Sequence, residues 1–410
     1  MEKSRLQRRD FFYFCSMIVI LFDDKGRNNL LPLTFTRPVS EIRVGILTIA
    51  EKWKHHLQAE ISYLTEEYLQ EKYPPSFKKQ NLFVNAGICP DEELLEAINR
   101  ISEGDALFAG DILIALKLNE TAAREFNIDQ TSRYQKKEYD SSFTKISFPE
   151  DIFINNDCEI RKDFKILTRG RSSRSLSNTN TVLGDDIFVE EGAEAECSTF
   201  NTNQGPIYLG KNSRVWEGCH IRGSFALGND ALVKMGAKIY GMTTIGPHSK
   251  VGGEIHNSVI FGNSSKGHEG YLGNSVLGEW CNIGADSNNS NMKNNYAEVR
   301  LWDYSMESFR KTGLQFCGLI MADHAKCGIN TMFNTGTVVG VSANIFGSGF
   351  PRNFIPDFAW GGNHGFEIYT LNKMFETATM VYQRRNVEFN DMEKRILIRI
   401  FELTEKFRRF

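Results

Sequence analysis

The sequence has 410 residues, which is enough for two or three domains of ordinary size. Hydrophobic residues make up 41% of the chain and charged residues 24%, and this balance excludes bulk disorder. The 48 Lys and Arg residues are offset by 51 Asp and Glu residues, so the net charge is -3. Because there is no overall basic excess, we expect neither nucleic acid nor a membrane surface as a partner. No apolar run reaches the ~20 residues that a bilayer-spanning helix needs.

The amino terminus combines basic residues with an apolar run, as a signal peptide does, but no small-residue cleavage site follows. We therefore expect residues 1–16 to be an extension without structure and Met17 to be the biological start. Residues 17–22 then form a buried strand, and the patterns that follow it predict an α/β domain over residues 17–130. Residues 131–180 are polar and irregular, and we expect them to form a linker. The eight cysteines form no CxxC pair, which favours reduced thiols in a cytoplasmic protein.

A six-residue repeat dominates the second half of the chain. Between residues 209 and 251 every sixth residue is aliphatic: Leu209, Val215, Ile221, Leu227, Val233, Ile239, Ile245 and Val251. After a phase shift and an insertion the repeat returns in two groups: Val259, Tyr271, Leu277 and Ile283, then Met321, Cys327, Phe333, Val339 and Ile345. A six-residue period is typical of a parallel β-helix, in which each short face contributes one inward side chain. The sequence therefore predicts a left-handed β-helix over residues 181–350, with residues 351–410 forming a helical cap over its last coil.

Residues 286–316 interrupt this repeat with a long polar insertion, and such insertions often build the binding face of a solenoid. Near it in the sequence lie His268, Tyr271, Asn282 and Asn291. Acetyl transfer from a thioester to an amine needs a base with a pKa near neutrality, a donor for the oxyanion, and amides that hold a polyhydroxy acceptor. These four side chains offer such groups, although from composition alone a single corner histidine is equally a structural residue.

The six histidines between residues 220 and 364 raise a second enzyme class. Trimeric β-helices of the gamma carbonic anhydrase class hold zinc with three histidines between subunits. The histidines here are scattered, so their spacing does not favour a zinc site.

The stretch Lys266–Gly273, together with Asn282–Ala285, is similar to the acetyltransferase signature of the GlmU family. These are bifunctional N-acetylglucosamine-1-phosphate uridyltransferase/glucosamine-1-phosphate acetyltransferases. The resemblance implies that His268 is the catalytic base and that acetyl-CoA is a co-substrate. It also implies that Tyr271, Asn282 and Asn291 contact the amino-sugar phosphate. Ala285 would contact acetyl-CoA.

Residues 251–259 and 324–330 look more like archaeal-type sugar-1-phosphate nucleotidylyltransferase/acetyltransferases. The chain departs from both groups in its cations. The bacterial enzymes have a lysine in the segment that matches Gly253–Ser258, and none is present here. The first of two lysines of the archaeal type aligns with Ala297. The resemblance therefore leaves the acceptor phosphate to other cations, namely Lys266, Lys293 or Arg300, with Arg222 and Lys234 as further candidates.

The first strand is followed by the pattern Pro-Leu-Thr-x-x-x-Pro at residues 32–38, which resembles part of the signature of sugar nucleotidyltransferases. In such enzymes backbone N–H groups cradle the nucleotide phosphates and basic side chains neutralise the leaving pyrophosphate. The usual glycine-rich loop is reduced to Gly26, and Val39 stands where the family has a lysine. The pair Gly110-Asp111 suits a plain strand equally well, so the metal ligands are not identified. The resemblance implies UTP and Mg²⁺ as ligands, with nucleotide binding by Lys25, Gly26, Arg27 and Arg37.

These patterns support three hypotheses. The first is a bifunctional enzyme that acetylates glucosamine-1-phosphate from acetyl-CoA and forms UDP-N-acetylglucosamine from UTP. The second is a transferase with only one of these activities, and the third is a non-catalytic β-helix scaffold. The resemblance also implies a homotrimer, with the acyl-CoA groove between neighbouring solenoids, and small-molecule substrates only.

Overall fold

The structure is a computed structural model that describes residues 17–410, so the expected extension at residues 1–16 lies outside the described residues. Two compact units are present. Of the described residues, the first comprises 17–28, Arg37–Ile42 and Leu47–Ser147, and the second comprises Asn29–Thr36, Arg43–Ile46 and Phe148–Phe410. None of the helices in the described part of the chain is long and apolar enough to cross a membrane.

The first unit is an α/β domain built on one six-stranded sheet. Its strands in spatial order are β2 (Glu60–Leu64), β1 (Met17–Phe22), β3 (Gln80–Asn85), β5 (Ile112–Asn119), β4 (Asp105–Ala109) and β6 (Gln135–Glu138). The predicted first strand is β1, which is buried along its whole length and pairs in parallel with β2 and β3. β6 lies inside the expected linker. It is an edge strand of polar, largely exposed residues, so the sequence lacks the apolar alternation that reveals a strand.

Three α-helices of the first unit begin at side-chain caps. They are α2 (Ile49–Leu57), α3 (Glu92–Arg100) and α4 (Glu120–Arg124), and their caps are Thr48, Asp91 and Asn119. Phe126, just after α4, packs its ring on Phe22 and Phe83 and so covers one face of the sheet. The shorter 3₁₀ helices are η1 (Lys25–Leu30), η2 (Val39–Glu41), η3 (Glu67–Leu69) and η4 (Ile128–Arg133).

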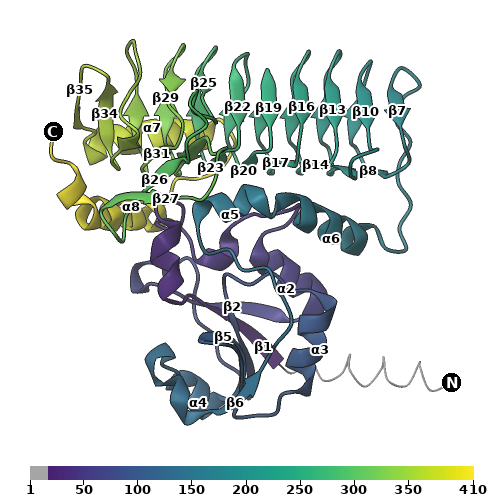
Figure 1. Ribbon diagram of the computed structural model, residues 1–410, viewed down its shortest axis with the longest axis vertical. Helices are drawn as coiled ribbons and strands as arrows, with labels where there is room; N and C mark the ends of the chain where they lie inside the picture. The colour runs from purple at the N-terminus through teal and green to yellow at the C-terminus, as the bar shows by residue number, and fades with distance from the viewer. Residues whose placement is uncertain (1–16) are drawn as a thin grey trace. The chain divides into compact units, whose positions relative to one another are not determined.

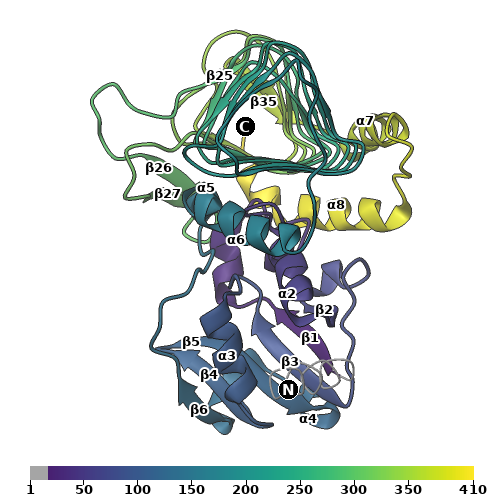
Figure 2. The same ribbon diagram turned by 90° about the vertical axis from the view of Figure 1, so that its right-hand side faces the viewer.

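The second unit is built around a parallel β-helix with three faces (Figures 1 and 2). Face 1 consists of β7 (Thr181–Leu183), β10 (Thr199–Asn201), β13 (His220–Arg222), β16 (Lys238–Tyr240), β19 (Glu254–His256) and β22 (Tyr271–Gly273). Face 2 consists of β8 (Ile187–Val189), β11 (Ile207–Leu209), β14 (Phe225–Leu227), β17 (Thr243–Ile245), β20 (Val259–Gly262), β23 (Val276–Glu279), β28 (Leu319–Met321), β31 (Thr337–Val339) and β33 (Phe354–Ile355). Face 3 consists of β9 (Glu194–Ala195), β12 (Arg214–Val215), β15 (Leu232–Val233), β18 (Lys250–Val251), β21 (Ser265–Lys266), β24 (Asn282–Ile283), β29 (Lys326–Cys327), β32 (Asn344–Ile345), β34 (Ala359–Gly362) and β35 (Gly365–Ile368). The predicted fold class, an α/β nucleotidyltransferase-like domain followed by a left-handed β-helix, is confirmed.

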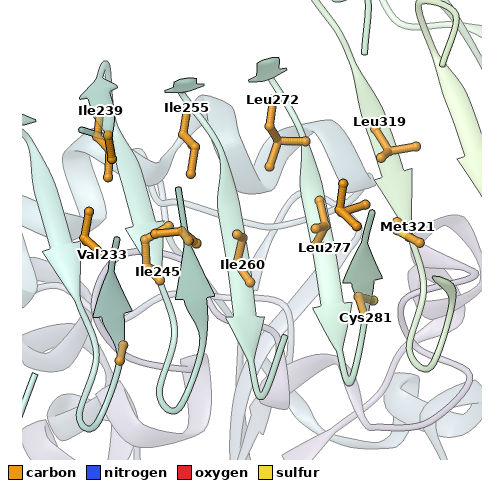
Figure 3. Close-up of a cluster of buried hydrophobic side chains, with 14 of the residues drawn as sticks. Val233, Ile239, Ile245, Ile255, Ile260, Leu272, Leu277, Cys281, Leu319 and Met321 are labelled. Atoms are coloured by element: carbon orange, nitrogen blue, oxygen red, sulfur yellow. The ribbon is translucent and has the colours of Figure 1, made fainter. Parts of the chain in front are cut away.

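The six-residue repeat forms the core of the β-helix. All eight aliphatic residues of the 209–251 group are buried there, as are the five residues of the 321–345 group. The middle group is shifted by one residue at two places, because Ile260 and Leu272 join the core instead of Val259 and Tyr271 (Figure 3). The shift follows a shorter corner: Ile255 enters the core only four residues after Val251, where the repeat predicts six.

Two helices precede the β-helix inside the expected linker, α5 (Pro149–Ile154) and α6 (Asn156–Thr168). They lie along face 2, α5 against β23 and α6 against β17 (Figures 1 and 2). The sequence predicts a linker here because the buried side of these helices includes charged residues, which hide the apolar pattern of a helix. The Glu150 carboxylate is buried and paired with Arg310 at 2.7 Å, and Asp163 accepts a hydrogen bond from the backbone N–H of Ile46 at 2.8 Å.

Residues 29–36 and 43–46 also belong to the second unit. Thr36 Oγ1 donates to Asp323 Oδ2 at 2.7 Å, and the backbone N–H of Gly45 donates to Asn156 Oδ1 at 2.8 Å. Gly45 has a φ of +80°, and a Cβ there would lie 2.5 Å from Asp163 Oδ2. Glycine is therefore required where this segment meets α6.

The polar insertion and the C-terminal segment complete the second unit. The insertion contains β25 (Asn288–Asn289), which pairs with β30 (Met332–Phe333), and a hairpin of β26 (Arg300–Asp303) and β27 (Ser308–Lys311). After β35 come α7 (Leu371–Gln383), α8 (Asp391–Leu403) and η5 (Glu405–Phe407), so the C-terminal segment is helical only in part. Tyr382 of α7 stacks on Trp280 at 3.8 Å, beside a coil in the middle of the solenoid. α7 therefore packs along the side of the β-helix, where the sequence predicts a cap over its last coil (Figure 1).

Candidate functional site

His268 lies on an exposed corner of the β-helix, between β21 and β22. The turn ends at Gly270, whose φ is +114°. A Cβ on Gly270 would lie 2.1 Å from the carbonyl oxygen of Ser287, so only glycine allows this corner to pack against the next coil. The fold therefore holds the His268 backbone close to the start of the polar insertion and leaves its side chain exposed.

Lys266 is buried inside the β-helix, one residue before this corner turns. It stands in line with Val251 of the preceding coil, where the six-residue repeat places an inward aliphatic side chain. Its Nζ donates to the carbonyl oxygens of Gly252 at 2.9 Å and His268 at 2.6 Å. Burial lowers the pKa of its ammonium group to about 8. Lys266 therefore fixes the His268 turn from inside, and the expectation that it binds the acceptor phosphate is not supported by its position.

If this corner carries the acetyl-transfer base that the resemblance implies, Lys266→Met should reduce kcat for acetyl transfer about 10- to 100-fold with little change in the KM for glucosamine-1-phosphate, because the turn that carries His268 loses its anchor. Steady-state kinetics measure both constants. Lys250→Met, at an exposed position of face 3 in the preceding coil, is the matched control and should change neither. A raised KM with unchanged kcat would instead assign Lys266 to phosphate binding.

Tyr271 and Asn291 are brought into direct contact. Asn291 Nδ2 donates to Tyr271 Oη at 2.9 Å and to Asn274 Oδ1 at 2.8 Å. Burial raises the pKa of the Tyr271 hydroxyl, which is therefore neutral at pH 7. Asn288 Oδ1 accepts the backbone N–H of Tyr271 at 2.8 Å and so ties the start of the insertion to β22. The result is a small polar cluster of Tyr271, Asn274 and Asn291. Its first member, Tyr271, follows His268 by three residues.

The other predicted acceptor and acetyl-CoA residues lie apart from this cluster. Asn282 is exposed on face 3, in register between Ser265 and Lys326. The carbonyl oxygen of Ala285 accepts a hydrogen bond from the N–H of Asn330 at 2.8 Å. Lys293 Nζ donates to the carbonyl oxygen of Glu298 at 2.7 Å, within the insertion. Arg300 is exposed on the β26–β27 hairpin, opposite Lys311.

Two lysines near the His268 corner have stronger positions. Lys238 is exposed in the same column of face 1 as Tyr271, and its Nζ lies 3.7 Å from a carboxylate oxygen of Glu269, next to His268. Lys234 Nζ lies against Gly267, since a Cβ on that glycine would be 3.2 Å from it. From the sequence, Lys234 is only a further candidate for the acceptor phosphate, and Lys238 is not identified. The alignment of Lys238 with Tyr271 cannot be read from the six-residue repeat, because the corner after Val251 is shorter than the repeat predicts.

A cavity of about 240 Å³ opens in the first unit and is lined by Asp24, Lys25, Gly26, Asn85, Asp111 and their neighbours. It lies where β1 and β3 end, and the carboxyl ends of parallel strands are the usual ligand sites of α/β sheets. Asp24 accepts hydrogen bonds from Lys145 Nζ at 2.7 Å, Asn85 Nδ2 at 2.8 Å and the N–H of Gly26 at 2.8 Å. Burial opposes ionisation of Asp24, but these partners outweigh it and lower its pKa. Lys25 is exposed at the same cavity and pairs with Asp129 at 2.7 Å.

Arg27 and Arg37, both predicted to bind nucleotide, are buried. Arg27 Nε lies 3.3 Å from Asp23 Oδ2, and Arg27 Nη2 donates to Tyr68 Oη at 3.2 Å. Burial raises the pKa of Asp23 to about 6, against the attraction of Arg27. Most of the Pro-Leu-Thr motif, residues 32–36, is part of the second unit. Of the four predicted nucleotide residues, Lys25 and Gly26 therefore line the cavity, whereas the two arginines are interior.

No group of three or more His, Cys, Asp or Glu side chains within residues 17–410 is placed to hold a metal ion. Mg²⁺ in phosphoryl-transfer sites is commonly held by one or two carboxylates together with substrate phosphates. Asp111, exposed at the turn between β4 and β5, lines the cavity beside Lys25 and Gly26. The residues present therefore fit a magnesium ion that arrives with a nucleotide.

Known proteins resemble this chain in both units. Residues 19–172 match the family model of sugar nucleotidyl transferases. The bifunctional protein GlmU of Methanococcus aeolicus is 26% identical over 68% of this chain and 58% of its own length. That of Thermus thermophilus is 27% identical over 47% of this chain and 48% of its own, and that of Methanocaldococcus jannaschii is 32% identical over 21% of each. The chain thus spans about half the length of the first two relatives.

A solved structure of an Arabidopsis UDP-N-acetylglucosamine acyltransferase also matches 57% of this chain and 91% of its own, at 15% identity and a TM-score of 0.25. At that TM-score the match adds nothing about the site. Residues 19–172 are thus similar to sugar nucleotidyl transferases, and the chain is similar to bifunctional GlmU proteins over part of their length.

Proposed function

We propose that this protein is a bifunctional transferase of nucleotide-sugar biosynthesis. It acetylates glucosamine-1-phosphate from acetyl-CoA and forms UDP-N-acetylglucosamine from UTP. The observation that carries the acetyl-transfer half is the polar cluster of Tyr271, Asn274 and Asn291 beside the exposed His268 corner. The cavity at the ends of β1 and β3, with its cation and carboxylates, supports the nucleotidyl-transfer half.

In the acetyl-transfer half, His268 is the proposed general base. The amine nitrogen of the acceptor attacks the thioester carbonyl carbon, and His268 takes the proton that this nitrogen loses. The carbon–sulfur bond then breaks, and the sulfur leaves as CoA after gaining a proton. The Tyr271 hydroxyl and the Asn291 amide orient the sugar, because both are neutral hydrogen-bonding groups that suit its hydroxyls.

The acceptor phosphate is the proposed ligand of Lys234, a further candidate from the sequence, and of Lys238, in place of Lys266, Lys293 and Arg300. We expect Lys238→Ala to raise the KM for glucosamine-1-phosphate about tenfold or more, since a charged hydrogen bond is lost, and to change kcat little. Steady-state kinetics at two salt concentrations check this, because the interaction weakens with screening. Lys211→Ala, at an exposed lysine of an earlier coil, is the control. An unchanged KM for the Lys238 variant would move the phosphate elsewhere.

In the nucleotidyl-transfer half, Lys25 and the backbone N–H groups around Gly26 are the proposed contacts to the triphosphate. Asp111 is the proposed protein ligand of Mg²⁺, which when bound neutralises charge on the phosphates during transfer. The sugar-phosphate oxygen attacks the α-phosphorus of UTP, and the bond to pyrophosphate breaks. The alternative is a single-activity enzyme with one unit inert, favoured by the short glycine loop and the buried arginines.

One experiment separates these functions. The full chain is incubated with glucosamine-1-phosphate, acetyl-CoA, UTP and Mg²⁺, and the release of CoA thiol and of pyrophosphate is followed separately. Release of both products supports the bifunctional enzyme, and release of one supports the single-activity alternative. Release of neither leaves the β-helix scaffold as the better hypothesis.

A homotrimer is the proposed assembly, because the resemblance implies an acyl-CoA groove between neighbouring solenoids and the polar insertion 286–316 offers a surface for that contact. Light scattering should give about three times the chain mass of 46.7 kDa. A monomer with full acetyl-transfer activity would contradict this assembly.

A further inference from the structure

A cavity of about 730 Å³ lies on face 1, within the second unit, and of the residues proposed for the acceptor it includes only Lys238. It crosses β10, β13, β16 and β19, which lie side by side in Figure 1. Its volume is in the usual range for small-molecule sites. The polar side chains that matter here are Asn201, Gln204, His220, Arg222, Tyr240 and His256.

Arg222 supplies the charge of this cavity. Its side chain is exposed and makes no ion pair with any residue of the described range 17–410. The nearby carboxylate of Asp157 is already held by Arg161 at 3.0 Å. Because the Asp157 carboxylate at this cavity is paired with Arg161, the Arg222 guanidinium remains suited to bind phosphate through two parallel hydrogen bonds.

Tyr240 and His256 supply an aromatic surface. Their ring centroids are 4.8 Å apart at an interplanar angle of 33°, and Tyr240 Oη donates to Glu254 at 2.6 Å. Gly241, with a φ of +66°, lies so close that a Cβ would be 2.7 Å from the His256 ring. The imidazole is therefore held against the turn. Aromatic faces of this kind stack on nucleobases.

Arg222 lies too far from Tyr271 for one sugar monophosphate to contact both. Neighbouring strands are about 4.8 Å apart, and Arg222 is three strands from Tyr271 through β16 and β19, so about 14 Å separates their strands. We propose that this face 1 cavity is a separate nucleotide site, in which Arg222 binds the phosphate and Tyr240 with His256 stacks on the base. Asn201 and Gln204 line the same cavity and supply amide groups for the base edge.

The test is isothermal titration calorimetry of the full chain with three ligands. These are UDP, uridine, which has no phosphate, and glucosamine-1-phosphate, which has no base. We expect Arg222→Ala to weaken one UDP-binding event about tenfold or more. Tyr240→Leu should weaken UDP about 5- to 100-fold through lost stacking but leave glucosamine-1-phosphate binding unchanged. Arg214→Ala, at an exposed arginine on face 3, is the matched control and should bind UDP like the wild type. A crystal structure of the full chain with UDP then locates the nucleotide.

UDP density in the cavity, with the loss confined to Arg222→Ala and Tyr240→Leu, supports the site. Wild-type affinity in Arg222→Ala, an equal loss in Arg214→Ala, or density only in the first unit each overturns it. Glucosamine-1-phosphate binding that depends on Arg222 as strongly as UDP binding does would make the site a sugar-phosphate site and also overturns it. None of these outcomes depends on the release of CoA or pyrophosphate, so failure of the proposed function is distinguished from failure of this site.

Discussion

Replacing His268 with alanine should reduce acetyl transfer to glucosamine-1-phosphate by about 10²- to 10⁴-fold, the usual cost of losing a general base. Most of an aliphatic amine is protonated at pH 7, so its attack on a thioester needs a group that accepts a proton near that pH. Imidazole is the side chain whose proton exchange is best suited to this role near neutral pH. Because the His268 side chain is exposed, its loss should affect neither folding nor the affinity for acetyl-CoA.

The measurement is the initial rate of CoA release under saturating acetyl-CoA, with thermal unfolding as the test of folding. His364→Ala is the control, because this histidine is also exposed but lies in the turn between β34 and β35. A His268→Ala enzyme within about threefold of wild type, far short of the typical loss, would remove the base assignment. The scaffold hypothesis would then become the stronger one.

The β-helix was predictable because its core depends on a simple period. Each coil needs one inward aliphatic residue per face, and the sequence keeps that spacing over most of the solenoid. The predicted core residues differ from the observed ones where the spacing departs from six residues. The corner after Val251 is short, which moved the core residue from Tyr271 to Leu272. Tyr271 thereby points outward, as a residue that binds a ligand must.

The polar parts of the structure were harder to predict. Lys266 occupies an inward position that a periodic pattern reserves for apolar residues, and its role depends on two carbonyl oxygens that no sequence pattern marks. α5 and α6 have buried carboxylates, including Glu150, whose partner Arg310 is far along the chain. The cations Lys234 and Lys238 lie against Gly267 and Glu269, the two neighbours of His268, from other coils. Such long-range pairings are fixed by the fold, so local sequence cannot reveal them.

The buried arginine of the first unit gives the second large expected effect. Arg27→Ala should destabilise the first unit by about 3–5 kcal/mol, the usual cost of removing one partner of a buried ion pair. Arg27 and Asp23 side chains are each 6% exposed, so the Asp23 carboxylate would remain buried without its cation. Pyrophosphate release should fall as a consequence of unfolding, because Arg27 is interior and does not line the nucleotide cavity.

The pH dependence of that loss identifies its cause. The pKa of Asp23 is raised to about 6 from an ordinary value of 3.8, so its burial costs stability above pH 6 and the cost disappears as the group protonates below about pH 4. Without Arg27 the pKa rises further, and the stability difference between variant and wild type should be largest above pH 7 and smaller at pH 5. Hydrogen exchange of peptides from β1 and β3 at both pH values measures this difference. Arg100→Ala, which breaks an exposed pair with Glu96 on α3, should have little effect at either pH. If Arg27→Ala is as stable as wild type yet releases no pyrophosphate, Arg27 acts on the nucleotide directly and the cavity must open further than it does here.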